Sequence, residues 1–346
     1  MALSTIRPST GFRNLIINGA MQVAQRGTSA VAAGAGTYPS IDRFKAWEGS
    51  DGAFTVEQST TAPAGFTTSF KAQVTTADTS LSAAQYAQVS QQIEAQNLQH
   101  LEYGTSGAKT LTLSFHVRSC KTGSYSITIY KDDTTRYLFS KSYTIDSADT
   151  WEKKTITITP DSNIKASGGA IANDNGIGFY VFWNLAGGTN YNDATDNAWS
   201  SNTSHFHTSS QVNWMDNTSN NFYLTGVQLE IGGPTDFEHR SYGDELARCM
   251  RYYQTAVPAG GDVFGTRIIF GGHIVSGNNT FGNVDHTVPM RAAPTITFNN
   301  LAFNGYPTGD PVLNGYGLTR FEVYKTANAN NNGSYYLFGY EANAEL

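Results

Sequence analysis

The run from Phe222 to Gln254 changes its periodicity once, and this change limits the folds that the chain can adopt. Apolar and polar residues alternate up to Ile231, which is the period of two that indicates a β-strand. A Gly-Gly-Pro break at 232–234 ends the strand, because proline removes a backbone donor and glycine releases the restriction on φ. The strand therefore cannot continue into the residues that follow.

A short helix is predicted after this break. Ser241 stands three and four residues before Asp244 and Glu245, which is a pattern typical of a capped helix start with early negative charge. Apolar residues then recur at the spacing of one helix face that can dock on a sheet. These residues are Leu246, Cys249, Met250 and Tyr253.

The middle of the chain shows several further strands. Polar residues alternate with apolar ones in each, which is typical of antiparallel sheets with one solvated side. Many short strands separated by turn residues favour an all-β jelly-roll sandwich over a helical or βαβ design. The alternating segments are Leu111–Arg118, Ser124–Tyr130, Thr155–Thr159 and Phe179–Leu185.

Changes in composition predict four segments. Residues 1–45 form an N-terminal arm, although 15–17 equally fit the first strand of the sandwich. Residues 46–233 form the jelly roll, 234–257 the helix and a linker, and 258–346 a smaller C-terminal β-sandwich with a strand at 287–290. The tips of that last domain, 299–317 and 326–333, are expected to expose aromatic side chains such as Tyr306 and Tyr316.

Several classes of function are disfavoured by charge and motifs. The net charge is -6 and no basic block is present, so we expect no nucleic-acid binding. No apolar run reaches the roughly 20 residues that span a bilayer, so we expect no membrane insertion. Nucleophile-elbow, P-loop and zinc-protease motifs are absent, so we expect no enzyme and no catalytic residues. The two cysteines fit buried thiols better than a disulfide, which is consistent with synthesis in a reducing cytoplasm.

The long polar and aromatic segment Leu185–Gln211 is the best candidate for ligand contact. Aromatic rings can stack on sugar faces while amides and carboxylates bind the hydroxyl groups. Contact with another subunit and ordinary packing under the loop are the alternatives. The candidate ligand-binding residues are Tyr191, Asn192, Asp193, Trp199, His205, His207 and, just beyond the loop, Trp214.

We predict no metal ligands and no cofactor. His205 and His207 lie two residues apart, so both would face one side of a strand, but the sequence places no third ligand beside them. Asp51 and the pair Asp132–Asp133 stand in turns where a structural calcium ion is the alternative to ordinary turn-forming aspartates.

Three parts of the chain resemble bacteriophage virion proteins, chiefly tail-fibre and tail-appendage proteins. Residues 227–254, VQLEIGGPTDFEHRSYGDELARCMRYYQ, are similar to the closing segment of a jelly-roll domain in that family. FRNLIINGAMQVAQRGTS, followed by YPSIDRF, resembles its opening, with Phe44 where tryptophan is commoner. TVPMRAAPTITF and EANAEL resemble its C-terminal part.

The middle segment also resembles carbohydrate-binding jelly-roll modules. The similarity covers VSQQIEAQNLQHL and GAKTLTLSFHVRSCKTGSYSITIY, with the later TITI and Tyr223–Glu230 segments in the same order. His116 occupies a position where these modules frequently carry tryptophan or tyrosine.

These resemblances imply a non-enzymatic virion structural protein, namely a tail-fibre or spike subunit for host attachment that binds surface glycan. The implied assembly is a homotrimer, and the arm would contact other tail or capsid proteins. The expected external partner is a glycan or protein of the host cell surface. The alternatives are a capsid or neck decoration protein without receptor binding, and a sugar-binding module from a non-viral source.

Overall fold

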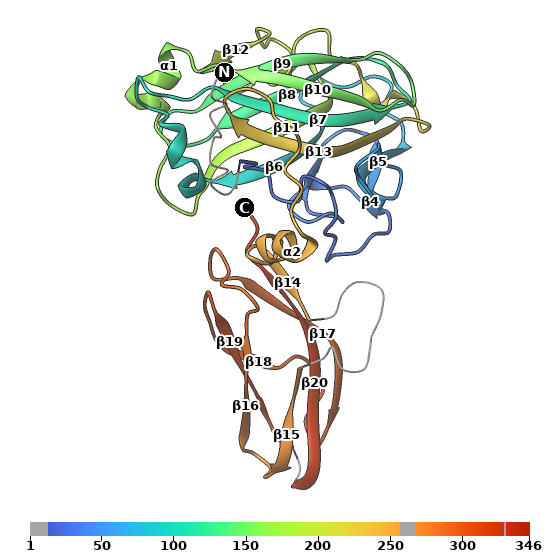
Figure 1. Ribbon diagram of the computed structural model, residues 1–346. Helices are drawn as coiled ribbons and strands as arrows, with labels where there is room; N and C mark the ends of the chain where they lie inside the picture. Colours follow the sequence, from blue (N-terminus) through green and yellow to red (C-terminus); the bar gives the residue numbers. More distant parts are fainter. Residues whose placement is uncertain (1–12, 257–267, 329) are drawn as a thin grey trace, which may run out of the picture. The chain divides into compact units, whose positions relative to one another are not determined.

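The computed structural model describes residues 13–256, 268–328 and 330–346. This part of the chain forms two compact units (Figure 1). The first unit contains residues 13–22, 30–39 and 44–240. The second contains 23–29 and 40–43 together with the described residues from Ser241 onward.

The first unit is a jelly-roll β-sandwich of two antiparallel sheets. The six-stranded sheet has the order β1-β4-β5-β13-β7-β10, and the seven-stranded sheet has the order β12-β9-β8-β11-β6-β3-β2. Strands of the first sheet are β1 (Val31–Ala32), β4 (Ala53–Ser59), β5 (Ser69–Thr76), β7 (Leu111–Ser119), β10 (Glu152–Ile158) and β13 (Asn221–Ile231). Strands of the second are β2 (Ala35–Thr37), β3 (Lys45–Glu48), β6 (Tyr86–Glu94), β8 (Gly123–Lys131), β9 (Tyr137–Ile145), β11 (Ile177–Gly187) and β12 (Ala198–Ser200).

Aromatic side chains join the two sheets across the core. Phe115 of β7 packs edge-on against Trp183 of β11, with ring centroids 5.9 Å apart. Phe44 contacts both Trp183 and Phe70 of β5. All four side chains are fully buried. The predicted alternating strands thus turn their apolar faces into one shared core, as period-two patterning requires.

Short helical turns lie in the connections of this unit. Helix α1 covers Ser162–Lys165, and Asp161 caps it by accepting a hydrogen bond from the backbone N–H of Ile164. The 3₁₀ turns are η1 (Ala95–Leu101), η2 (Ser167–Gly169), η3 (Thr189–Tyr191) and η4 (Trp214–Asp216).

Strand β13 contains a β-bulge that the alternation pattern did not predict. Thr225 pairs with His116, but Gln228 already pairs with Ser114, so β13 holds one extra residue at this point. The core-facing set therefore changes phase along the strand. Leu224 lies opposite Val117 before the bulge, and Leu229 lies opposite Leu113 after it. A single alternation along the whole strand therefore assigns the core-facing residues correctly only after the bulge.

The second unit is a smaller β-sandwich with one docked helix. Helix α2 covers Tyr242–Met250, and Ser241 caps it by accepting from the backbone N–H of Asp244. Strand β20 (Asn331–Asn343) is central in one sheet, flanked by β14 (Tyr253–Thr255), β15 (Ile268–Ile274) and β17 (Thr295–Asn304). The other sheet has the order β16-β19-β18: β16 (Asn279–Asp285), β19 (Arg320–Thr326) and β18 (Val312–Tyr316). No helix in the described part of the chain is long and apolar enough to cross a membrane.

Two predicted details of the second unit are wrong. Residues 287–290 do not form a strand, and Met290 instead packs into the core cluster of the sandwich. Tyr306 is not exposed at a tip, because its ring packs edge-on against Tyr336 and its hydroxyl group bonds Thr280. Tyr316 is exposed, as predicted. Residues 257–267, at the predicted boundary between the linker and the C-terminal domain, lie outside the described residues.

The described part of the expected N-terminal arm is not a separate segment. Ile16 and Met21 are fully buried in the first unit, and the backbone N–H of Leu15 bonds the carbonyl of Leu229. Residues 23–29 and 40–43 belong to the second unit. Val23 and Ile41 are also buried, whereas residues 28–32 are exposed. A docking role for the segment stays a prediction.

Charged side chains from distant parts of the sequence gather inside the second unit. The carboxylate of Glu345 pairs with Arg43 and, at 3.2 Å, with Arg26. The guanidinium groups of Arg43 and Arg26 lie over the rings of Tyr252 and Tyr253, at 3.4 and 3.7 Å from the centroids. These contacts join segments of the N-terminal, central and C-terminal sequence motifs.

Candidate functional site

An aromatic groove lies on the outer face of the seven-stranded sheet. Its cavity has a volume of about 260 Å³. Strands β3, β6, β8 and β11 supply the floor, and the segment between β11 and β13 supplies a wall. The residues that line the aromatic groove are Trp47, Tyr86, Gln88, Tyr130, Tyr180, Phe182, Tyr191 and Phe206.

The floor of the groove is a row of nearly parallel rings. Tyr180 and Phe182 are two residues apart on β11, so they point to the same face, and their planes differ by 6° at a centroid distance of 5.5 Å. Tyr130 of β8 pairs directly with Tyr180, and these rings stack at 5.5 Å. Trp47 of β3 lies next to this row at 6.1 Å from Phe182, with its ring plane tilted by 54°.

Three other rings stand across this row and form the wall. Phe206 meets Phe182 edge-on at 5.4 Å and Tyr130 at 6.3 Å. Tyr191 meets Phe206 edge-on at 5.8 Å, and Tyr86 meets Tyr191 at 6.0 Å. Each ring is thus fixed by its neighbours, so the groove keeps its shape without a ligand.

Polar groups are present between the rings. Gln88 is held in place because its Nε2 donates to the side-chain oxygen of Asn184 at 2.8 Å. The hydroxyl groups of Tyr130 and Tyr180 form no hydrogen bond with the residues that the structure describes. Burial raises the pKa of both phenols, with the nearby Asp132 adding to the effect. Both hydroxyl groups therefore stay protonated at neutral pH and can donate to a ligand.

The arrangement suits a neutral molecule with one apolar face and several hydroxyl groups. Aromatic rings supply dispersion contact to C–H surfaces, and the phenols and the amide supply hydrogen bonds. The lining residues include no charged side chain, serine or cysteine.

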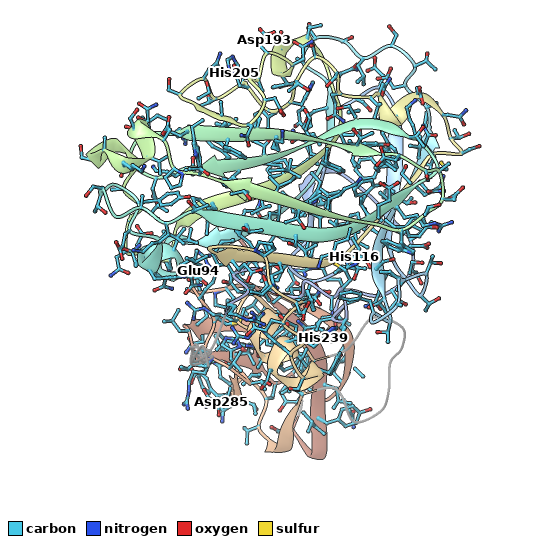
Figure 2. All side chains as sticks on the ribbon, turned by 45° about the horizontal axis from the view of Figure 1, so that its top comes forward. Glu94, His116, Asp193, His205, His239 and Asp285 are labelled. Atoms are coloured by element: carbon cyan, nitrogen blue, oxygen red, sulfur yellow. The ribbon has the colours of Figure 1, made fainter. Side chains whose placement is uncertain are left out.

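The predicted ligand-binding residues are distributed unevenly around this groove. Tyr191 lines it. Asn192 and the exposed Asp193 follow directly in the chain, in the loop that Figure 2 shows together with His205. The ring of His205 is held by Ser200 and Asn202.

The other three predicted residues are buried. Trp214 has no exposed surface, packs against Phe54 and donates to the carbonyl of Asn221. Trp199 is 8% exposed and donates to the carbonyl of Thr159. His207 is 1% exposed, and burial lowers its pKa. Their rings present no free face for stacking, because other residues of the first unit cover them.

Seven groove residues were not among the predicted ligand-binding residues: Trp47, Tyr86, Gln88, Tyr130, Tyr180, Phe182 and Phe206. A signal was available on two strands. Tyr130 alternates with Ile127 and Ile129, and Tyr180 with Phe179 and Val181, so each stands on the face opposite the core. An aromatic residue on the outer face of a strand has no packing role in the sandwich, which favours a surface role.

His116 lies on the six-stranded sheet and not in the groove. Its ring contacts Phe66 at 5.3 Å, and Phe66 also contacts Phe237 and His239. Burial and the neighbouring Lys153 lower its pKa. The replacement of an aromatic residue by His116 therefore leaves the aromatic groove unchanged.

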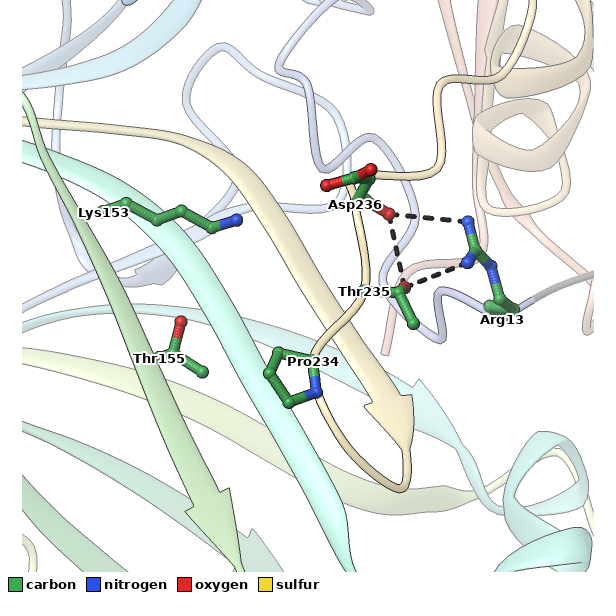
Figure 3. Close-up of a pocket in the computed structure, with 6 residues that line it drawn as sticks. All are labelled: Arg13, Lys153, Thr155, Pro234, Thr235 and Asp236. Atoms are coloured by element: carbon green, nitrogen blue, oxygen red, sulfur yellow. Dashed lines mark hydrogen bonds between the residues drawn. The ribbon is translucent and has the colours of Figure 1, made fainter. Parts of the chain in front are cut away.

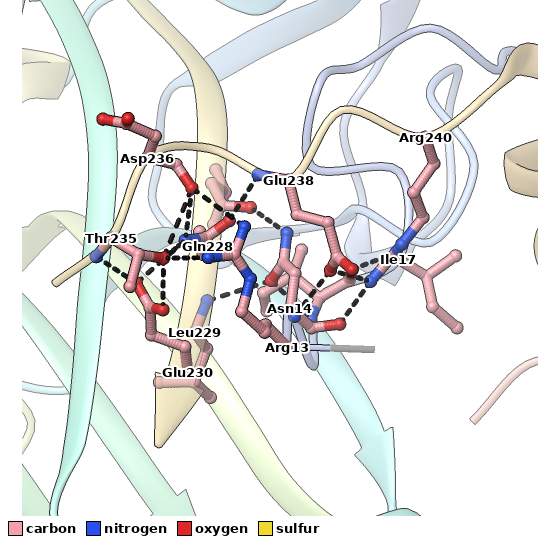
Figure 4. Close-up of polar contacts among 12 residues, drawn as sticks. Arg13, Asn14, Ile17, Gln228, Leu229, Glu230, Thr235, Asp236, Glu238 and Arg240 are labelled. Carbon is pink, nitrogen blue, oxygen red and sulfur yellow. Dashed lines mark hydrogen bonds and ion pairs between the residues drawn. The ribbon is translucent and has the colours of Figure 1, made fainter. Parts of the chain in front are cut away.

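A second cavity lies on the six-stranded sheet, with a volume of about 750 Å³ (Figure 3). Arg13, Lys153, Thr155 and residues 234–236 line it. Arg13 donates to the side chain of Thr235 at 3.0 Å and to the carbonyl of Asp236 at 3.5 Å. The cavity thus borders a network that joins residues 13–17 to the end of β13 and to residues 235–240 (Figure 4).

The turn with the proposed calcium ligands contains a lysine ammonium group. Nζ of Lys131 donates to the carbonyl groups of Asp133 and Thr135, and Asp132 pairs with Arg136 at 2.8 Å. Burial lowers the pKa of Lys131 to about 8. Across the described residues, no three histidine, cysteine or acidic side chains gather as a metal site. The cysteines Cys120 and Cys249 are both free thiols, the first of them partly exposed.

No protein-family model and no curated protein matches the sequence. Similar solved structures include a Bacteroides thetaiotaomicron protein described as a sugar-binding candidate, with 14% identity and a TM-score of 0.35 over 63% of this chain and 100% of that one. The enzymatically active domain of tailspike protein 4 from bacteriophage CBA120 has 12% identity and a TM-score of 0.31 over 64% of this chain, which spans 22% of that protein. A family 11 carbohydrate-binding module from Clostridium thermocellum, solved with a mixed-linked tetrasaccharide, has 11% identity and a TM-score of 0.31 over 62% and 99%. Scores of this size assign no function.

Proposed function

We propose that the first unit binds a glycan in the aromatic groove, and that the chain is a non-enzymatic structural protein of a virion. The observation that carries the proposal is the fixed row of Tyr130, Tyr180 and Phe182 with two free phenol donors. Rings in this arrangement have no partner in the sandwich core. A pyranose offers the matching chemistry, because its C–H face can pack on the rings while its hydroxyl groups accept from the phenols.

The virion role is supported by the sequence motifs at both ends and in the middle of the chain, which resemble tail-fibre proteins. On this proposal the protein is a tail-fibre or spike subunit, assembled as a homotrimer, and the glycan belongs to the surface of the host cell. On this proposal the protein has no cofactor, and the ammonium group of Lys131 bonds the carbonyl groups of the 132–135 turn in place of a calcium ion there.

The test is adsorption competition with the purified, labelled protein on host cells. We expect saturable binding that blocks phage adsorption, and we expect Tyr180→Ala and Trp47→Ala to weaken it at least about tenfold, since each removes a stacking ring. Tyr316→Ala is the matched control, because this tyrosine is 58% exposed but lies outside the groove. Tyr180→Phe keeps the ring and removes the hydroxyl group, so it distinguishes the contribution of ring stacking from that of the hydrogen bond.

Two outcomes would contradict the proposal in different ways. Cell binding that survives both groove substitutions would place the receptor site elsewhere in the molecule. A folded protein that binds neither cells nor glycans would favour the capsid or neck decoration role, for which incorporation into the virion head at fixed stoichiometry is the confirming measurement.

A further inference from the structure

The floor of the aromatic groove continues sideways onto strands that a loop covers. Thr128 of β8 lies beside Phe182, and Ser140 of β9 lies beside Thr128 in the same row. In the next row Asn184 lies beside Gln88 on one side and Ser126 on the other. The covered part thus consists of hydroxyl and amide groups directly adjoining the aromatic rings.

Residues 188–211, here called the covering loop, form hydrogen bonds with these polar groups. The carbonyl of Phe206 accepts hydrogen bonds from Thr128, from Asn184 at 3.2 Å and from Ser140 at 3.2 Å. Ser140 also donates to the carbonyl of His205 at 2.7 Å. One backbone oxygen therefore takes the position that a ligand oxygen would need in order to reach all three donors.

The outer edge of the covering loop is fastened to β9. The carboxylate of Asp196 pairs with Lys141 at 2.6 Å and accepts from the backbone N–H of Ser142 at 2.7 Å. Strand β12 extends the sheet at the same edge, with Trp199 opposite Phe139. The loop is thus part of the sheet, and the wall that Phe206 forms is fixed.

From this geometry we infer that the aromatic groove is closed on the β8–β9 side and takes the end of a glycan, one or two uncharged sugar units, rather than the middle of a long chain. The inference rests on the proposed glycan binding and adds the class of ligand. Phe206 is the specificity-determining residue, because its ring stands where a longer chain would continue.

Volume and charge both agree with this ligand class. The cavity of about 260 Å³ is smaller than the roughly 300–1,000 Å³ of pockets for drug-sized ligands. The lining residues carry no cation to pair with a carboxylate or sulfate, and burying an unpaired charge is unfavourable. The nearby ammonium group of Lys45 lies over the Trp47 ring, 4.6 Å from its centroid, and is not among the lining residues. An uncharged sugar is therefore the ligand that the lining favours.

The experiment is a length series measured by the fluorescence of the full-length protein, in which Trp47 reports on the groove. The probes are the methyl glycosides of glucose, galactose, mannose and N-acetylglucosamine, and their uncharged oligomers of two to six units. We expect the affinity of the best series to stop rising at the disaccharide, with less than about a threefold change in Kd beyond it. An oligomer blocked at its non-reducing end is expected to lose binding, because the methyl group of the glycosides already blocks the reducing end.

Variants of the residues that hold the covering loop test whether this loop closes the groove, without removing the rings on which a sugar would stack. Thr128→Val combined with Ser140→Ala removes donors to the Phe206 carbonyl while keeping every ring, and we expect longer oligomers to gain at least about tenfold over the disaccharide. Phe206→Ala is expected to give the same change in length dependence. Ser124→Ala is the control, because its hydroxyl group contacts only the exposed Ser210 end of the loop. Near-ultraviolet circular dichroism verifies that each variant is folded.

Three results would overturn the inference, and they are distinguishable. Affinity that rises steadily to the hexamer in the unaltered protein refutes end recognition but leaves glycan binding intact. Unchanged length dependence in the folded loop variants refutes the role of Phe206. Binding of no probe, or binding that Tyr180→Ala does not reduce, removes the proposed function itself and the inference with it.

Discussion

Residues of the sequence motifs that resemble tail-fibre proteins form hydrogen bonds and ion pairs with one another. Asn14 donates to the carbonyl of Val227 and accepts from the backbone N–H of Leu229, and its own N–H bonds Glu238 (Figure 4). Glu238 in turn pairs with Arg240 at 3.1 Å. These polar side chains satisfy buried backbone groups that the end of β13 would otherwise leave unpaired. The residues that resemble a phage family thus support the fold, and the groove residues lie outside those motifs.

One buried carboxyl group predicts a measurable pH dependence. Burial raises the pKa of Asp42 from 3.8 to about 6, against the opposing effects of Arg26 and Gln25. The folded protein therefore binds this proton more tightly than the unfolded chain, so its stability falls as the pH rises from about 4 through about 6. The difference of roughly two pKa units corresponds to about 3 kcal/mol.

Asp42→Asn removes this titration. We expect the free energy of unfolding of the variant, relative to the unaltered protein, to increase by up to about 3 kcal/mol between pH 4 and pH 7.5. Urea unfolding at both pH values measures it, and the difference between the two proteins cancels the carboxyl groups with lowered pKa, such as Glu238 and Glu152. A difference that does not vary with pH would refute the assignment.

At the scale of elements, the β-bulge in β13 depends on one glycine. Gly226 has φ of 60°, and a Cβ atom there would lie 2.7 Å from the ring of Phe66 and 2.8 Å from His116. The bulge turns the strand so that Leu224 and Leu229 both face the core although they are five residues apart. The alternation rule fails here because it assumes an unbroken ladder.

Gly226→Ala should destabilise the first unit more than Gly232→Ala. Gly232 also has positive φ, 85°, but nothing lies within 4 Å of its Cβ position. The control thus carries only backbone strain of about 1–2 kcal/mol. Displacement of Phe66 and His116 should add about 1–3 kcal/mol at Gly226. An equal loss of stability in the two variants, measured by thermal unfolding, would show that Phe66 and His116 move aside without a loss of stability.

At the scale of the whole molecule, the two units are not consecutive in the sequence. The second unit takes residues 23–29 and 40–43 from the N-terminal region, and these supply Arg26, Asp42 and Arg43. The cation–π and ion-pair partners of Tyr252, Tyr253 and Glu345 therefore come from more than 200 residues away. No single cut of the chain leaves this unit complete.

A fragment of residues 241–346 is accordingly expected to be unfolded or much less stable than the same residues in the full chain. It would keep Glu345 as a carboxylate without its arginine partners, and removal of one partner from a buried pair costs about 3–5 kcal/mol. Near-ultraviolet circular dichroism and urea unfolding of the fragment measure this loss. A fragment that unfolds cooperatively at the midpoint of the full chain would show that the N-terminal residues are dispensable.

The all-β class, the short capped helix and the positions of five long strands were determined by the sequence alone. These features depend on local patterns: the period of two, the Gly-Gly-Pro break and the Ser241 cap act within a few residues of themselves. The same local reasoning identified the covering loop as unusual and selected Tyr191, which lines the aromatic groove.

Only the tertiary structure decided which aromatic residues meet and which are buried. Trp199 and Trp214 have the same local context of polar loop residues as Tyr191, yet they are buried because segments distant in the sequence cover them, with Phe139 against Trp199 and Phe54 against Trp214. Trp47, Tyr130 and Tyr180 come together because β3, β8 and β11 belong to one sheet, and strand order depends on pairing between residues far apart in the chain. A groove formed across strands is a property of that pairing, whereas alternation along one strand specifies only which side of the sheet each residue faces.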